Sequence, residues 1–366
     1  MKLNKPRSAD GSATWKRRIT VYRAGLAMLA LLLLAACSTN EALETVPPAP
    51  PALEEPVVTE PEPEPEPTGF RAPLTGLLQE EEATLRPIAV MINNNGPARP
   101  QSGLTGADVI WEVLAEGGIT RLVAIYQSQS FPEAIGPIRS IRPYLIELGE
   151  SYQAVLAHAG GSPEAYSILQ RQAKPYLDEI GNAGSFFWRE SFRKAPHNLY
   201  SNLEKLREGA ERRNYKTEVP IPVMRFLDKD ELVIGDAATE IEISFLLKSY
   251  KVSYSYDETS GQYLRSINDS PHTDMNNDQQ LSAANLVVLG TSHRTLDSEG
   301  RLAVDLTSGG PAVVFRQGTA VEAEWERRGD DAIRIMKDGS ELAFAPGKTY
   351  YHIVPMTPTF ADHLLY

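Results

Sequence analysis

The segment VIWEVLAEGGITRLVAIYQ, residues 109–127, contains two apolar runs joined by a short glycine-containing turn sequence. β-Branched and aromatic side chains are frequent in both runs, as is typical of strands, and EGGIT is suited to a turn. We therefore predict a β-hairpin, with strands at 109–115 and 121–127. Alternation along the first strand places Glu112 on its solvent-exposed face.

Further strand patterns lie on both sides of this hairpin. RPIAVMI (86–92) is typical of a buried strand and ends at three asparagines, of which Asn93 is the first. YQAVLAH (152–158) has the same character. If the helix predicted between 121–127 and 152–158 connects these two strands, the crossover makes them parallel, because such connections are right-handed and join parallel neighbours.

Three helices are expected in the same part of the chain. One is opened by Pro143 and extends to about residue 151, since proline is favoured at the first helical position. A second begins after Ser162, a plausible N-cap, and a third follows Ser201, which has capping-box spacing to Glu204 and precedes a helix running to about residue 213. Strands mixed with helices indicate an α/β or α+β domain over residues 70–215.

The remainder of the chain has a different pattern. KVSYSYDETSGQYLRSI, AVVFRQGTAVEAEWER and IRIMKDGSELAF each place turn residues between alternating runs, and Asp338-Gly339 is the strongest turn signal. These patterns indicate a mainly antiparallel β domain over residues 219–366.

The N-terminus has the features of a bacterial lipoprotein signal peptide at residues 1–36. Seven basic residues and one acid precede the apolar run AGLAMLALLLLAA (24–36), which is shorter than the roughly 20 residues that span a bilayer. The run ends in LAAC, the lipobox pattern in which Cys37 becomes the first residue of the mature chain and carries lipid such as palmitate. The alternative is an ordinary secretory signal followed by an incidental cysteine.

Residues 37–69 are predicted to form a disordered stalk. Eight glutamates, nine prolines and no Lys or Arg occur between Ser38 and Gly69, so this segment has little apolar surface to bury. Proline favours an extended conformation, which would hold the body away from a membrane. The alternative is a disordered tail with no spacer role.

Charge and cysteine content exclude several functions. Removal of residues 1–36 leaves 29 basic residues against 47 acidic ones, a balance that argues against a nucleic-acid partner. Cys37 is the only cysteine, so the body has no disulfide, thiol nucleophile or cysteine–zinc site.

Asp274, Asn276 and Asp278 resemble the start of a calcium loop, but Gln279 replaces the turn glycine, which favours a polar turn. We predict no metal and no cofactor.

An anion-binding site is the chemistry that the sequence favours most. Arg139 and Arg142 lie just before the helix opened by Pro143, and arginines and helix N-termini both favour anions. If the predicted strands are parallel, their carboxyl ends and the following helix N-termini share one edge. The candidate binding residues are Arg139, Arg142, His158, Gly160, Gly161, Ser162, Arg193, His197, Asn198 and Asn93. The alternative is that these residues have separate structural roles.

Seven ordered motifs in the body resemble those of the YerB-like bacterial lipoproteins, a family catalogued as a domain of unknown function, number 3048. They are RPIAVMINN, ARPQSGL, ADVIWEVLAEGGITR, IGPIRSIRPY, HAGGSPEAY, FWRESFRKAPHNLY and PGKTYYHIVP. The resemblance covers roughly residues 75–357 and implies a two-domain extracytoplasmic lipoprotein. It implies no reaction and no catalytic residues.

Two main functions remain after these exclusions. The first is a non-catalytic module, anchored to the bacterial cell membrane through lipidated Cys37, that binds an anionic cell-wall or envelope ligand or a partner protein. The second is an envelope hydrolase or transferase that uses His158, His197 or Glu116 as acid–base groups. A purely structural assembly factor is a third hypothesis. Because no catalytic motif is recognised in the sequence, we favour the non-catalytic module.

Overall fold

The computed structural model describes residues 69–228, 231 and 233–366. The predictions for the signal peptide, for lipidated Cys37 and for residues 38–68 of the stalk therefore fall outside the described residues. Among the described helices, none is long and apolar enough to cross a membrane.

A sheet of 12 strands contains strands from both halves of the body. In spatial order, its strands are β22 (Ser340–Glu341), β21 (Arg334–Lys337), β20 (Thr319–Glu326), β19 (Gly310–Arg316), β16 (Asn285–Thr291), β23 (Thr349–Pro355), β4 (Val109–Leu114), β5 (Thr120–Tyr126), β3 (Ile88–Asn93), β6 (Val155–His158) and β7 (Tyr176–Asp178), with β10 (Asp236–Ala237) beside β20. Neighbouring strands are antiparallel except at β16–β23, β23–β4, β3–β6 and β6–β7.

A smaller sheet of six strands comes entirely from the second half of the body. It comprises β14 (Ser270–Pro271), β13 (Gln262–Ile267), β12 (Lys251–Asp257), β11 (Glu240–Ser244) and β24 (Leu364–Leu365), with β15 (Ser282–Ala283) beside β13. Three two-stranded ribbons complete the described strands: β1 (Phe70–Arg71) with β2 (Leu78–Gln79), β8 (Trp188–Arg189) with β9 (Leu199–Tyr200), and β17 (His293–Thr295) with β18 (Leu302–Val304).

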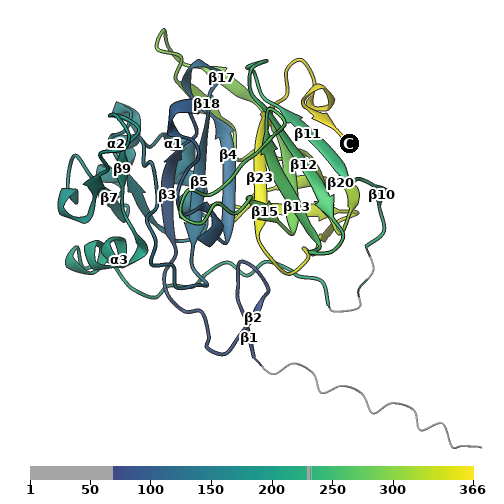
Figure 1. Cartoon of the computed structure of the whole chain (residues 1–366), viewed down its shortest axis with the longest axis horizontal. Helices are drawn as coiled ribbons and strands as arrows, with labels where there is room; N and C mark the ends of the chain where they lie inside the picture. Colours follow the sequence, from purple (N-terminus) through teal and green to yellow (C-terminus); the bar gives the residue numbers. More distant parts are fainter. Residues whose placement is uncertain (1–68, 229–230, 232) are drawn as a thin grey trace, which may run out of the picture. The chain divides into compact units, whose positions relative to one another are not determined.

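Strand β23 joins the two halves of the body. It lies between β16 and β4 and is parallel to both, so a strand near the C-terminus pairs with one from the first half (Figure 1). Trp111 on β4 stacks on Tyr351 of β23 with ring centroids 4.0 Å apart. The division of the body at residues 215–219 stays a prediction, and any test of it must take this shared sheet into account.

Both faces of the large sheet are covered, which produces three layers. Alternate side chains of β3, β4 and β5 point to opposite faces. One face packs against the six-stranded sheet and helix α3 (Leu203–Arg212), through residues that include Ile110 and Leu114. The other face packs against helices α1 (Pro143–Glu150) and α2 (Pro163–Arg171), through residues that include Trp111 and Val113.

This layering overturns the prediction for Glu112. The side chain points to one face of β4, as the alternation predicts, but that face is covered by the six-stranded sheet and Glu112 is only 1% exposed. A single polar residue in an apolar strand resembles a solvent-facing position, and the sequence contains no local sign of the sheet that covers it.

Most predicted local structures are confirmed. Strands β4 and β5 form the antiparallel hairpin, with Leu114 opposite Thr120 and Gly117 and Gly118 at positive φ in the turn. Antiparallel pairing also joins β12 to β13, β19 to β20, and β21 to β22. Asp338 and Gly339, at φ values of 50° and 79°, form the turn between β21 and β22, as their sequence predicts.

The helix starts are confirmed at two of three positions. Pro143 opens α1, and the Ser162 hydroxyl caps α2 by accepting a hydrogen bond from the Ala165 amide at 3.2 Å. The N-cap of α3 is Asn202 rather than Ser201, because the Asn202 side chain accepts from the Lys205 amide at 2.9 Å. The Ser201 hydroxyl instead donates to the carbonyl of Phe186 at 2.7 Å.

We expect Ser162→Ala to lower the free energy of unfolding by about 1 kcal/mol, because it leaves an amide in the first turn of α2 without its hydroxyl acceptor. The measurement is urea unfolding followed by circular dichroism. Ser167→Ala, within the same helix, is the matched control and should be neutral or slightly stabilising, since alanine is the better helix former. Equal destabilisation by both substitutions would contradict a capping role.

Candidate functional site

The loop that carries the two predicted arginines lies between the ends of strands β3 and β6. The Asn93 amide donates to the Pro137 carbonyl, and the Arg139 amide donates to the Met91 carbonyl, each at 2.8 Å. On its other side, the loop accepts a hydrogen bond from the Ala159 amide at the Arg139 carbonyl, at 3.1 Å. These backbone bonds fix Arg139 and the following Arg142 at the carboxyl-end edge of β3 and β6.

The strand arrangement behind this edge differs from the prediction. Strand β5 pairs antiparallel with β3, and β3 pairs parallel with β6, so the strands at 121–127 and 152–158 are antiparallel and not adjacent. The helix that connects the two strands in sequence does not indicate that β3 lies between them in the sheet. As a result, the start of β5, at Thr120 and Arg121, lies opposite the carboxyl ends of β3 and β4, at the same edge of the sheet as the carboxyl end of β6.

This arrangement adds Arg121, which the sequence analysis missed, to the predicted arginines. Arg121 is only 3% exposed, and its Nη1 donates to the Ser140 carbonyl at 2.7 Å. Its buried Nε, like that of Arg139, has no hydrogen-bond partner among the described residues. We refer to Arg121, Arg139 and Arg142 as the arginine cluster.

One carboxylate partly balances this positive charge. Arg142 donates through Nε to Oε1 of Glu116, and through Nη1 to the Ile141 carbonyl at 2.8 Å. Burial alone would raise the pKa of Glu116, but the hydrogen bond and charge of Arg142 hold it below its ordinary value. Glu116 is therefore ionised near neutral pH.

Charge repulsion within the cluster is visible in its pKa values. Burial, and then repulsion from Arg142, lower the pKa of Arg121 to about 10. The same two causes, in the same order, lower the pKa of Arg139. Three close guanidinium groups with one carboxylate leave positive charge that a bound anion could balance.

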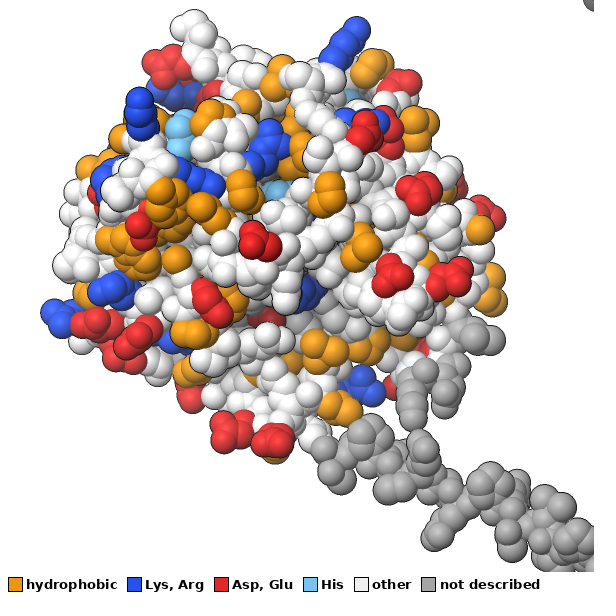
Figure 2. Space-filling model, in the orientation of Figure 1, with side chains coloured by type: hydrophobic (Ala, Val, Ile, Leu, Met, Phe, Trp, Pro, Cys, Tyr) orange, Lys and Arg blue, Asp and Glu red, His pale blue; other side chains and the backbone are white. Residues whose placement is uncertain are grey.

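Asn93 and His197 lie beside this cluster. The Nδ2 atom of Asn93 is 2.8 Å from Nδ1 of His197. Burial, followed by repulsion from Arg139 and Arg193, lowers the pKa of His197. In Figure 2, blue Lys and Arg side chains gather with pale-blue His side chains in the upper part of the face shown. The predicted Arg139, Arg142, His197 and Asn93 are therefore neighbours.

Two other candidates make local contacts. Arg193 donates to the carbonyls of Ala98 and Pro100, which ties the 190s loop to the segment after β3. Asn198 donates to the Glu190 carbonyl at 3.0 Å and accepts from Arg189 at 3.1 Å. Both side chains already have protein partners.

The remaining candidates lie around Asp178, and their backbone joins the arginine loop because the Ile141 amide donates to the Gly160 carbonyl at 3.0 Å and the Ser162 amide donates to the Ile141 carbonyl at 3.3 Å. His158 is fully buried, with Nδ1 2.9 Å from the Gly160 carbonyl and 3.5 Å from Asp178 Oδ1. Burial, opposed by the Asp178 charge, lowers the pKa of His158 to about 4, so the ring is neutral near pH 7. The Gly160 amide donates to Asp178 at 2.8 Å, Gly161 follows it, and Ser162 caps α2.

Comparisons with known proteins agree with this architecture. Residues 74–216 match the family described as "Protein of unknown function (DUF3048) N-terminal domain", and residues 241–351 match its C-terminal domain. The chain is 37% identical over 288 residues to "Putative lipoprotein YerB" of Bacillus subtilis (strain 168), covering 78% of this chain and 86% of that protein.

The chain belongs to the DUF3048 family.

A solved structure supports the fold as well. The crystal structure of YerB protein from Bacillus subtilis superimposes with a TM-score of 0.74 at 36% sequence identity. The match covers 81% of this chain and 98% of that one. The family description gives no activity, so the chemistry of this DUF3048 chain has to be inferred from its own side chains.

A second charged cluster in this DUF3048 chain is sealed from solvent. Arg265 of β13 donates from Nη2 to Glu112 Oε2 at 2.7 Å, and the two side chains are 2% and 1% exposed. Tyr250 and Thr120 donate to Glu112 Oε1 at 2.5 and 2.7 Å, and Nδ1 of His352 lies 3.3 Å from Glu112 Oε2. The cavity beside this cluster has no room for a water molecule, so the arrangement is suited to joining the two sheets.

In the acidic turn that resembles a calcium loop, the carboxylate of Asp274 accepts hydrogen bonds from the protein itself. The Asp274 carboxylate is fully buried and accepts hydrogen bonds from the amides of Gly103, Thr105 and Asn276 at 2.9–3.0 Å. This carboxylate therefore fastens the turn to the segment after β3. Within the described residues, no group of three or more His, Cys, Asp or Glu side chains is arranged to hold a metal ion.

Proposed function

We propose that this protein is a membrane-anchored extracytoplasmic lipoprotein whose body binds an anionic cell-envelope ligand at the arginine cluster. The anchor is supported by the LAAC sequence before Cys37 and by the word lipoprotein in the name of its Bacillus relative. The binding role is carried by one observation: buried Arg121 has an Nε without a described partner beside two further arginines.

The surroundings of the cluster favour binding over acid–base catalysis. Arg142 holds Glu116 ionised, so this carboxylate is a poor proton donor near neutral pH. His158 is buried and lies in the Asp178 group, away from open solvent. The side chains around Arg121 and Arg139 instead offer hydrogen-bond donors, which are the groups that recognise phosphate, sulfate or carboxylate.

The anion hypothesis predicts a ligand-dependent rise in melting temperature. Ligands that bind only the folded state stabilise it by mass action, so phosphate, sulfate or a peptide carboxylate should raise the melting temperature of the full chain in detergent. Arg142→Gln should weaken the response at least about tenfold in ligand concentration, because charge-assisted hydrogen bonds contribute roughly 1.5–3 kcal/mol. Arg142→Lys should restore little, since lysine lacks the planar fork.

Two further variants make this test specific. Arg139→Gln should weaken the response in the same direction, because Arg139 lies in the same cluster. Arg171→Gln removes one exposed arginine from the far end of α2 and is the matched control for net charge. A response of equal size in wild type and Arg142→Gln would contradict anion binding and indicate that these arginines have structural roles.

A further inference from the structure

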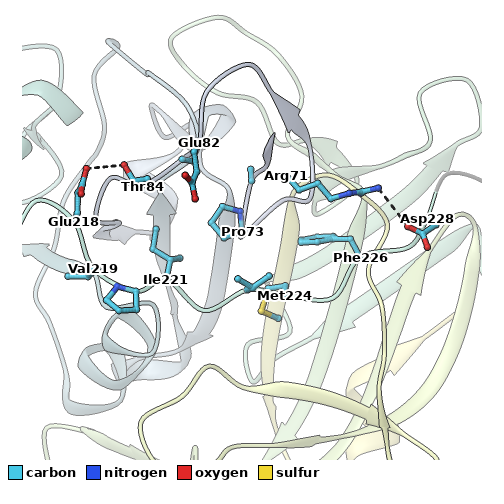
Figure 3. A pocket seen from close by; sticks show the side chains of 14 residues that line it. Arg71, Pro73, Glu82, Thr84, Glu218, Val219, Ile221, Met224, Phe226 and Asp228 are labelled. Atoms are coloured by element: carbon cyan, nitrogen blue, oxygen red, sulfur yellow. Dashed lines mark hydrogen bonds and ion pairs between the residues drawn. The ribbon is translucent and has the colours of Figure 1, made fainter. Parts of the chain in front are cut away.

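A groove lies at the junction between the start of the body and the segment that links its two halves. Its volume is about 770 Å³, and it is formed by residues 71–73, 82–84, 218–221, 223, 224, 226 and 228 (Figure 3). We call it the linker groove. Pro73, Ile221, Met224 and Phe226 give it an apolar lining. It is separate from the arginine cluster, none of whose residues lines it.

The lining is held in place rather than loosely folded. The Met224 amide donates to the Pro73 carbonyl at 3.1 Å, and the Arg86 amide donates to the Thr217 carbonyl at 2.7 Å. Phe226 packs so closely against Gly76 that a Cβ on this glycine would lie 2.3 Å from the ring. The groove is therefore preformed, which lowers the conformational cost of binding.

The rim of the groove is acidic. Among the described residues that line it, Glu82, Glu218 and Asp228 are acidic and Arg71 is basic, with Arg71 3.7 Å from Asp228. Glu218 accepts a hydrogen bond from Thr84 at 3.0 Å. The Glu82 carboxylate is exposed and has no partner among the described residues. An apolar floor with excess negative charge around it is complementary to a ligand with apolar and cationic groups.

The backbone along one wall can pair with an extended chain. Residues 219–223 have the sequence VPIPV, and a residue before proline is restricted to extended conformations. The amides of Ile221 and Val223 donate to no described residue. Extended peptides commonly bind by pairing with such free backbone groups while their side chains enter pockets.

We propose that the linker groove docks an extended segment of a partner protein in which apolar side chains alternate with Lys or Arg. Charge argues against the chain's own stalk, because residues 38–69 carry eight glutamates and no basic residue. It also argues against a second copy, because residues 70–366 carry 39 acids against 29 basic residues and a copy would present the same acidic rim. This proposal does not depend on the anion-binding function.

The test uses a fluorescent seven-residue peptide of alternating lysine and valine, titrated with the full chain in detergent and followed by fluorescence anisotropy. Glutamate replaces lysine in the control peptide. We expect the lysine peptide to bind and the glutamate peptide not to bind. Glu82→Lys should weaken binding about fivefold, because an exposed attraction becomes a repulsion. Val223→Asp, at a position 68% exposed and so tolerant of substitution, should weaken it more than about tenfold.

The matched control is Glu258→Lys, which makes the same charge change in the exposed turn between β12 and β13. It should bind the lysine peptide like wild type. Equal affinities of wild type, Glu82→Lys and Val223→Asp would overturn the proposal. Binding that appears only after deletion of residues 38–68 would assign the groove to the stalk instead. Dimerisation in sedimentation that Glu82→Lys changes would assign it to a second copy.

Discussion

Arg265→Met is expected to lower the free energy of unfolding by about 3–5 kcal/mol, because it leaves the Glu112 carboxylate buried without its cationic partner. Arg265 is the only arginine or lysine paired with Glu112 among the described residues, and both groups are sealed between the two sheets. Removal of the guanidinium also leaves His272 Nδ1 without its donor and takes one of two partners from the Tyr254 hydroxyl, which keeps His352 Nε2 at 2.9 Å. Urea unfolding at pH 7, followed by tryptophan fluorescence, measures the loss.

Two variants separate charge burial from loss of packing. The double substitution Arg265→Met with Glu112→Leu should recover much of the lost stability, since apolar replacement of a whole buried pair is often nearly neutral. Arg212→Ala breaks an exposed helical pair with Glu208 and should cost no more than about 0.5 kcal/mol. A loss below about 1 kcal/mol for Arg265→Met would show that this ion pair is not a main link between the sheets.

The same pair predicts a dependence on pH. Burial acts to raise the pKa of Glu112, but the Arg265 charge and the neighbouring hydrogen bonds hold it well below its ordinary value. A carboxyl with a depressed folded-state pKa stabilises the fold above its unfolded pKa, about 4.3, and this stabilisation is lost as pH falls toward the folded value. The stability difference between wild type and Glu112→Gln should therefore be constant from about pH 7 to 5 and shrink below about pH 4.3.

Cys37→Ala is expected to abolish incorporation of a fatty-acid analogue completely. Cys37 is the only cysteine of the chain, so no second thiol can accept the thioether-linked lipid. The variant should be released from the membrane or remain as an unprocessed precursor, because the apolar run before Cys37 is too short to replace the anchor as a spanning helix. Metabolic labelling and membrane fractionation measure both effects.

Ser38→Ala is the matched control for this prediction, because it alters the next residue and leaves the acceptor thiol intact. It should be labelled and fractionate like wild type. Labelling that persists in Cys37→Ala would rule out lipidation at this residue. It would leave an ordinary secretory signal as the better explanation of the N-terminal sequence.

Local patterns predicted much of the fold because they depend on neighbours in the sequence. The hairpin at 109–127, the helix start at Pro143 and the turn at Asp338-Gly339 each rest on a few adjacent residues. The Ser201 cap failed by one residue because the neighbouring Asn202 is an equally good cap, and tertiary contacts engaged the Ser201 hydroxyl elsewhere.

Strand order and burial could not be read in the same way, because they depend on pairings between distant segments. Because β3 lies between β5 and β6, the start of β5 rather than its end lies near the predicted arginines. This arrangement adds Arg121 to the cluster. The burial of Glu112 also depends on a distant segment. Alternation placed its side chain on one face of the strand, but the sheet that buries this face is contributed by residues more than a hundred positions away.

The central place of β23 has a consequence for the order in which the chain can fold during synthesis. Residues 349–355 are made after both β4 and β16, yet they complete the middle of the large sheet between these two strands. Until they arrive, both neighbours have open edges and Trp111 lacks its stacking partner. A chain synthesised N-terminus first therefore cannot complete the large sheet around Trp111 until residues 349–355 have been made.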